Sequence, residues 1–212
     1  MQASADMTSQ PLAAPAARSG SASVRRGRSR LANLAIMVVT AAVILLVAYT
    51  VNRPSTAPGS LQRVDLIGTP QGPPPILGQI APPLRATALD GSAVDVTALV
   101  GKPVWISFGA TWCQPCRAEN PDIQAAYEAY QAQGLVVVQI YMNEDASVAA
   151  DYAARVGLTY VKVPDPDGRL SIDYRILGIP SHFFVDRSGV LREIKVGTLD
   201  RAGIDAILAE LM

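Results

Sequence analysis

The two cysteines constrain this chain most, because they are its only two and stand three residues apart, at Cys113 and Cys116. They follow residues 103–109, a short apolar run that is typical of a strand. Residues 113–131 have helical character, so the pair stands where a strand turns into a helix and opens a strand–helix–strand unit. No cysteine is left for a disulfide framework, so the fold must rest on its hydrophobic core.

The motif Trp112-Cys113-Gln114-Pro115-Cys116 predicts redox chemistry rather than two inert core cysteines or half of a metal site. The thiolate is the reactive form, and a free thiol has a pKa of about 8.5. Unpaired N–H groups and partial positive charge at a helix N-terminus stabilise the thiolate of Cys113. Pro115 suits the first helical turn, where a missing N–H costs nothing. The spacing lets Cys116 reach back to a mixed disulfide on Cys113 and release the partner. We therefore expect Cys113 to attack and Cys116 to resolve.

Apolar runs and turn signals predict the rest of an outer domain at residues 78–212. Asp90-Gly91 lies between two short apolar runs and predicts an N-terminal hairpin. Further strands are expected at 135–141, 158–163, 181–185 and 190–196, and further helices at 146–156, 170–177 and 202–211. A strand–helix–strand unit requires parallel strands, and the late hairpin adds antiparallel ones. The order predicts an α/β fold with a mixed central sheet and helices on both faces.

Residues 31–52 form an uncharged, mostly apolar run. About 20 apolar residues are needed to span a bilayer as a helix. The apolar region of a signal peptide is shorter, about 7–15 residues, and ends at a small-residue cleavage site that is missing here. A buried helix of a soluble protein would have a polar face. The run therefore predicts a single transmembrane helix that is retained as a signal anchor.

Charge around this run predicts its orientation. Five arginines precede it, and the nearest base after it is Arg53. Positive charge stays on the cytoplasmic side, which would place the outer domain beyond the inner membrane, in the periplasm or on the outer surface of the membrane of a bacterium. Disulfides persist in that compartment. Residues 1–30 are expected to be a disordered cytoplasmic tail, and the Pro- and Gly-rich residues 53–77 a stiff linker.

Composition excludes several other classes of function. The chain carries 18 basic and 18 acidic side chains, so nothing indicates nucleic-acid binding, which relies on a basic excess. Two cysteines and one histidine fall short of the four or so ligands of structural zinc. We therefore predict no metal and no cofactor. Nothing beyond the membrane segment suggests assembly, so a monomer is expected.

Residues 108–121, FGATWCQPCRAENP, resemble the active-site signature of the TlpA/ResA-type membrane-anchored thioredoxin-like disulfide reductases, which include the cytochrome c maturation thioredoxins. Further similar segments are 89–91, 101–103, 165–168, Tyr174, 178–180 and 183–186. The resemblance covers about residues 78–212. It implies a thioredoxin-like fold, disulfide-containing client proteins with apocytochrome c as one candidate, and a membrane thiol-electron transporter as electron donor.

The same resemblance implies roles around the dithiol. Pro180 would be a cis-proline that faces the cysteines, and Ile179 before it would contact an extended client peptide. Taken alone, Pro180 fits an ordinary turn or the start of a strand. Trp112, Gln114 and Pro115 would line the surface that meets the client, with Trp112 also shielding the site.

Three polar residues raise the question of proton transfer. Glu119 lies three residues beyond Cys116, hence on the same side of the helix. The resemblance places it near the dithiol, where it could accept the proton of Cys116, although a solvated helix carboxylate is an equal reading. Ser107 stands where thioredoxins carry a buried Asp, and a hydroxyl cannot serve as a carboxylate base. His182 reads as a strand residue rather than one that tunes the thiols.

Other functions share this motif. An oxidase or isomerase is possible, because Gln114-Pro115 does not fix the reduction potential. A thiol peroxidase normally lacks a C-x-x-C partner for its reactive cysteine. A copper metallochaperone would use Cys113, Cys116 and His182, a ligand set that can bind copper, but known copper chaperones on this fold space their cysteines one residue wider.

Overall fold

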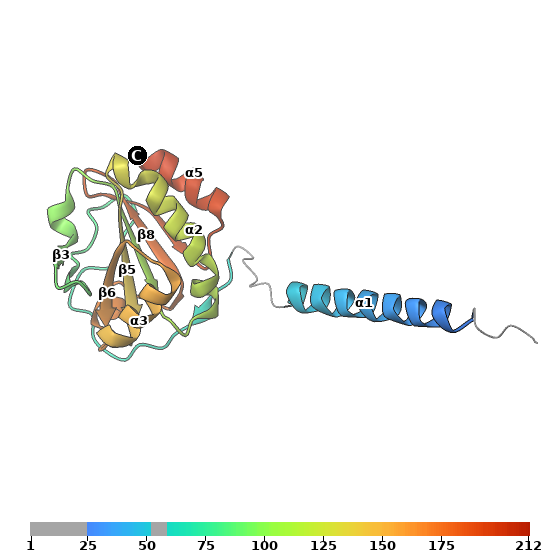
Figure 1. The fold of residues 1–212 in the computed structure, drawn as a ribbon. Coiled ribbons are helices and arrows are strands. Elements are labelled where there is room, and N and C mark those ends of the chain that lie inside the picture. The colour runs from blue at the N-terminus through green and yellow to red at the C-terminus, as the bar shows by residue number, and fades with distance from the viewer. Residues whose placement is uncertain (1–24, 52–58) are drawn as a thin grey trace, which may run out of the picture. The chain divides into compact units, whose positions relative to one another are not determined.

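The structure is a computed structural model that describes residues 25–51 and 59–212. The chain divides into two compact units, Met1–Arg53 and Pro54–Met212. In the first unit the described element is α1, Arg25–Val51 (Figure 1). Within the described ranges, no helix is both long and apolar enough to cross a membrane. Residues 1–24 of the predicted tail, and residues 52–58, lie outside the described residues.

A five-stranded mixed sheet in the order β6-β5-β4-β8-β9 forms the centre of the second unit. The middle strand β4 (Val104–Gly109) runs parallel to β5 (Val136–Met142), which runs parallel to β6 (Val161–Asp165). On the other side, β8 (Ser181–Val185) and then β9 (Leu191–Val196) are antiparallel. The predicted mixed sheet is confirmed.

Three longer helices cover one face of this sheet. α2 (Gln114–Tyr130) connects β4 to β5, and α3 (Ala146–Val156) connects β5 to β6. Both crossovers run in the same direction along the sheet, so right-handed connections place both helices on the same face. α5 (Arg201–Leu211) lies beside α2 (Figure 1). Alternate strand residues such as Trp105 and Phe184, stacked 5.0 Å apart, fill the layer beneath them.

The opposite face is covered by shorter elements. The hairpin of β2 (Arg85–Thr87) and β3 (Ala93–Asp95) forms as predicted. Gly91 in its turn has a φ of 84°, a conformation that glycine adopts without steric cost. The 3-10 helix η1 (Val96–Leu99) follows the hairpin and packs Val96 into the hydrophobic core on this face of the sheet.

The short helix α4 (Arg169–Asp173) lies on the same face, so helices flank the sheet on both sides. It ends four residues before the predicted limit at 177. Arg175 has a φ of 57°, which is incompatible with a continuing right-handed helix. The buried hydroxyl of Tyr174 donates to the carbonyl of Pro82 at 2.8 Å and ties the end of α4 to the segment that leads into the hairpin.

Residues 59–77 lie against the domain, although the sequence predicts them as part of a linker. The two-residue strand β1 (Gln62–Arg63) pairs antiparallel with β7 (Gly178–Ile179). Val64 extends the pairing by donating its N–H to the carbonyl of Leu177 at 3.2 Å, and its side chain packs on the core. This segment is therefore part of the folded unit.

Candidate active site

Cys113 and Cys116 lie at the junction between β4 and α2 and form a disulfide. Cys113 is the N-cap of α2, and its Sγ accepts the N–H of Cys116 at 3.2 Å. Pro115 occupies the first helical turn, as predicted. Once the disulfide is reduced, the charge of a Cys113 thiolate is placed where helix N–H groups stabilise it. Both cysteines are buried in this state.

The Ile179–Pro180 peptide bond is cis and lies beside the dithiol. The carbonyl oxygen of Ile179 is 3.9 Å from Cys113 Sγ. The predicted cis conformation of Pro180 is thus confirmed, and its position next to the reactive sulfur agrees with the resemblance. Ile179 is also paired with Gln62 of β1.

The remaining predicted site residues form two groups around the dithiol, an accessible rim and a buried floor. Trp112 and Gln114 are exposed, Trp112 by 44%, and Pro115 is half-buried. These three residues are accessible to a partner approaching the dithiol. Ile179 and Pro180 are buried, so they offer chiefly backbone rather than side chain.

A buried polar layer lies between α2 and the sheet. Glu119 is 2% exposed, which excludes the solvated-carboxylate reading. Its Oε1 lies 3.3 Å from Nε2 of His182, and its Oε2 accepts the N–H of Leu199 at 3.2 Å. His182 is fully buried, and its Nδ1 accepts a hydrogen bond from Nε1 of Trp105 at 3.3 Å. The prediction that His182 is simply a strand residue is therefore incomplete, because its ring lies within this polar layer.

The layer extends from His182 to the dithiol. Ser107 on β4 is in register with Gln139 on β5 and His182 on β8. The Ser107 hydroxyl is buried and makes no hydrogen bond with the described residues. Gly109 has no Cβ, and the side chains of Gln139 and Cys116 occupy the space that a Cβ would need. A Cβ there would lie 2.9 Å from Nε2 of Gln139 and 3.3 Å from Sγ of Cys116. The polar side chains of this layer therefore extend across the sheet from His182 to the resolving cysteine, Cys116.

Glu144 is a site residue that the sequence reasoning missed. It is buried just beyond the end of β5, where its Oε2 accepts the N–H of Thr111 at 2.8 Å and its Oε1 accepts the Thr111 hydroxyl. Thr111 lies two residues before Cys113, so this carboxylate holds the loop that presents the nucleophile. Because parallel strands end at the same edge of a sheet, an acidic residue directly after β5 lies close to the end of the neighbouring strand β4. This is the sequence signal that could have identified Glu144.

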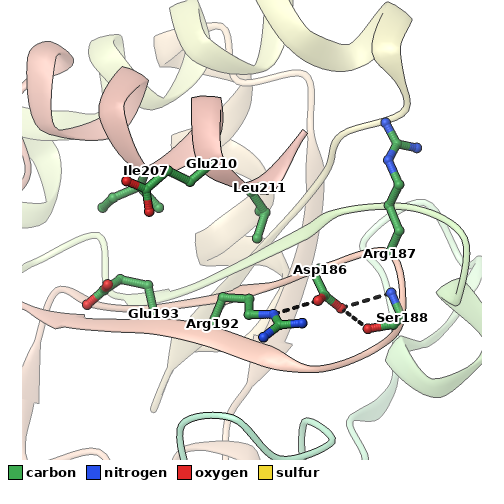
Figure 2. A pocket seen from close by; sticks show the side chains of 8 residues that line it. All are labelled: Asp186, Arg187, Ser188, Arg192, Glu193, Ile207, Glu210 and Leu211. Carbon is green, nitrogen blue, oxygen red and sulfur yellow. Dashed lines mark hydrogen bonds and ion pairs between the residues drawn. The ribbon is translucent and has the colours of Figure 1, made fainter.

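A pocket of about 610 Å³ lies elsewhere, between the β8–β9 turn and α5 (Figure 2). Asp186, Arg192 and Ser188 are joined there by an ion pair and hydrogen bonds. The pocket contains no cysteine and none of the residues around the cis-proline. The reactive groups are therefore those of the Cys113–Cys116 pair, and this pocket contains none of them. Across the described ranges, no group of three or more His, Cys, Asp or Glu side chains is arranged to hold a metal ion.

This combination of a mixed sheet, a C-x-x-C pair capping a helix and an adjacent cis-proline defines a thioredoxin-fold thiol–disulfide oxidoreductase. A sequence profile of the AhpC/TSA family matches residues 77–194, and the chain belongs to that family.

Relatives agree with this class. The thiol-disulfide oxidoreductase ResA of Geobacillus thermodenitrificans is 30% identical over 128 residues, which are 60% of this chain and 74% of the relative. ResA of Oceanobacillus iheyensis is 34% identical over 115 residues, 53% of this chain and 60% of the relative. Among solved structures, a thiol:disulfide interchange protein of the thioredoxin family from Chlorobium tepidum is 30% identical, with a TM-score of 0.57 over 64% of this chain and 97% of that one.

Proposed function

We propose that this oxidoreductase reduces disulfides of client proteins outside the cytoplasm. The observation that carries the proposal is the placement of Cys113 as the N-cap of α2, with the Cys116 N–H on its sulfur and the cis Ile179–Pro180 bond alongside. This placement favours a thiolate at Cys113 and puts the backbone of Ile179, whose carbonyl oxygen is 3.9 Å from Cys113 Sγ, next to the attacking atom.

The reaction consists of two exchanges. The thiolate of Cys113 attacks a client disulfide, a new S–S bond joins Cys113 to the client, and one client thiolate leaves and takes up a proton. Cys116 then loses its proton to Glu119 and attacks Cys113 Sγ. The Cys113–Cys116 disulfide forms, the bond to the client breaks, and the second client thiolate takes up a proton. Two electrons thus pass from the dithiol to the client.

The client surface consists of the rim residues Trp112, Gln114 and Pro115. A groove of about 360 Å³ begins next to them at Arg117 and runs between α2 and α3. An extended client peptide that also pairs with Ile179 competes with β1 for that edge, because Gln62 occupies it in this structure.

A membrane setting is part of the proposal. Residues 31–52 would anchor the chain in the inner membrane, with the arginine-rich N-terminus cytoplasmic and the catalytic domain periplasmic. The uncharged run and the preceding arginines support this arrangement. The named relatives are thiol–disulfide oxidoreductases, which supports the chemistry. Apocytochrome c is the proposed client, and a membrane thiol-electron transporter is the proposed electron donor. Protease accessibility of the domain in intact spheroplasts tests the orientation, since a periplasmic domain is cleaved and a cytoplasmic one is protected.

The reduction potential of the Cys113–Cys116 pair tests the direction of electron flow. The protein would be equilibrated in glutathione or dithiothreitol buffers, and the fraction of oxidised dithiol measured by alkylation. A potential near that of thioredoxin, about −270 mV or lower, supports a reductase. A potential near about −120 mV, that of a strong oxidant, overturns the reductase assignment in favour of an oxidase on the same fold.

A further inference from the structure

The surroundings of His182 fix the position of its proton. His182 is the only histidine in the chain and is fully buried. Its Nδ1 accepts the indole N–H of Trp105 at 3.3 Å. An indole nitrogen can only donate, so Nδ1 must carry a lone pair, and the single proton of the neutral ring is on Nε2. A proton on Nδ1 would place two N–H groups against each other, so the contact with Trp105 keeps the proton on Nε2.

The protonated nitrogen faces Glu119. Nε2 lies 3.3 Å from Oε1 of Glu119, yet within the described residues it has no acceptor at good hydrogen-bond angles. A small rotation of the ring closes the hydrogen bond to Oε1, and closing it is favourable because an unpaired buried donor is costly. The other oxygen of Glu119 already accepts the N–H of Leu199. The carboxylate is thus held between two neutral donors.

Other titratable groups around this pair are neutral or paired elsewhere. Burial raises the pKa of three nearby phenols, those of Tyr141, Tyr152 and Tyr160. They are therefore uncharged at neutral pH. Lys195 on β9 is in register with His182, but its ammonium group lies 3.1 Å from Glu193. The buried charges that remain in this region belong to Glu144, which accepts two hydrogen bonds from Thr111, to Glu119 and to the reduced dithiol.

We propose that His182 is a positioning residue for the resolving step, in which its Nε2–H holds the Glu119 carboxylate ionised and oriented to take the proton of Cys116. This inference rests on the proposed role of Glu119 as that acceptor. Glu119 and Cys116 are three residues apart on α2, and such helix neighbours have Cβ atoms about 5–6 Å apart. A donor to the charged form of a carboxylate favours that form, so its removal moves the resolving step to higher pH.

The resolving step can be timed in the full chain with 5,5′-dithiobis(2-nitrobenzoate). The reduced protein releases one thionitrobenzoate when Cys113 is modified and a second when Cys116 resolves the mixed disulfide. Stopped-flow absorbance from pH 5 to 9 gives the rate of the second release. The variants are Glu119→Gln, His182→Leu, His182→Gln (which keeps an N–H donor), and the double variant Glu119→Gln/His182→Leu. Urea unfolding of each variant measures stability separately.

We expect Glu119→Gln to slow the second release by about 100-fold, the lower end for loss of a general base. His182→Leu slows it about tenfold near neutral pH, as expected for one lost hydrogen bond to a charged group, and shifts the profile to higher pH. His182→Gln restores most of the rate, and the double variant is no slower than Glu119→Gln, because the two residues act through one group.

Three results would contradict the inference, and each removes a different part of it. A normal pH profile in His182→Leu, with Glu119→Gln still slow, removes the role of His182 alone. A normal rate in Glu119→Gln removes the proposed proton acceptor and the inference with it. Loss of stability in His182→Leu without a shifted profile also counts against the proposal, because it indicates only a packing role.

Discussion

Replacing Glu144 should loosen the loop that carries the nucleophile. The Glu144 carboxylate accepts two hydrogen bonds, both from Thr111, and is itself buried. A hydrogen bond to a charged group contributes about 1.5–3 kcal/mol, so two lost bonds set an upper range of about 3–6 kcal/mol. Thr111 is half-buried, and water can recover part of this loss. We expect Glu144→Ala to lower the free energy of unfolding by about 2–4 kcal/mol, and Glu144→Gln, which keeps one acceptor, by about 1–2 kcal/mol.

Asp145 provides the matched control. It is the next residue and also an acid, but it is exposed and its side chain makes no hydrogen bond to the helix it precedes. Asp145→Ala should therefore change stability by about 0.5 kcal/mol or less. Urea unfolding of the oxidised proteins gives these values, and insulin reduction should fall in Glu144→Ala by up to about 100-fold, the cost of displacing a catalytic group by about 1 Å. If Glu144→Ala and Asp145→Ala proved equally stable and active, the role assigned to this carboxylate would be refuted.

Three further predictions follow from single contacts. Gly109→Ala places a Cβ against Gln139 and Cys116 and should cost about 1–3 kcal/mol in urea unfolding, whereas Gly72→Ala, with open space around it, should not. Burial alone would raise the pKa of Asp186, but hydrogen bonds from Ser188, Val190 and Arg192, of which Figure 2 shows those from Ser188 and Arg192, lower it from 3.8 to about 2. The stability from this ionised group is complete above about pH 4 and is lost as the pH falls towards 2, so the advantage of the unmodified protein over Asp186→Asn should shrink across that window, and a constant difference would contradict the assignment. Gln62→Pro breaks the pairing of β1 with β7 and should speed insulin reduction by freeing the edge of Ile179, while an unchanged rate would show that clients do not use that edge.

The parts of the fold that were predicted correctly depend on local pattern. The strand before Cys113, the helix after it and the hairpin at Gly91 each have their own apolar period or turn residue. Helix α3 matches its predicted limits, residues 146–156. The early end of α4 was missed because Arg175 adopts a left-handed conformation that arginine does not signal in sequence.

The unpredicted features depend on pairs that are distant in sequence. β1 and β7 are two residues long and lie more than a hundred positions apart, so neither has a detectable period. The dithiol could be recognised because its two residues and their helix are contiguous. The contacts of Glu119 with His182, and of Glu144 with Thr111, depend on which strands become neighbours, and Glu119 alone could not be distinguished from a surface acid.

Trapping the intermediate with a client disulfide tests the central claim most directly. Cys116→Ser and Cys113→Ser variants of the reduced protein would be mixed with insulin, quenched with acid and analysed by mass spectrometry of the intact complex and its peptides. The account predicts a persistent mixed disulfide on Cys113 in Cys116→Ser and no complex in Cys113→Ser. Normal turnover by Cys116→Ser, or a complex formed through Cys116 in the other variant, would contradict the assignment of Cys113 as the attacking cysteine and Cys116 as the resolving one.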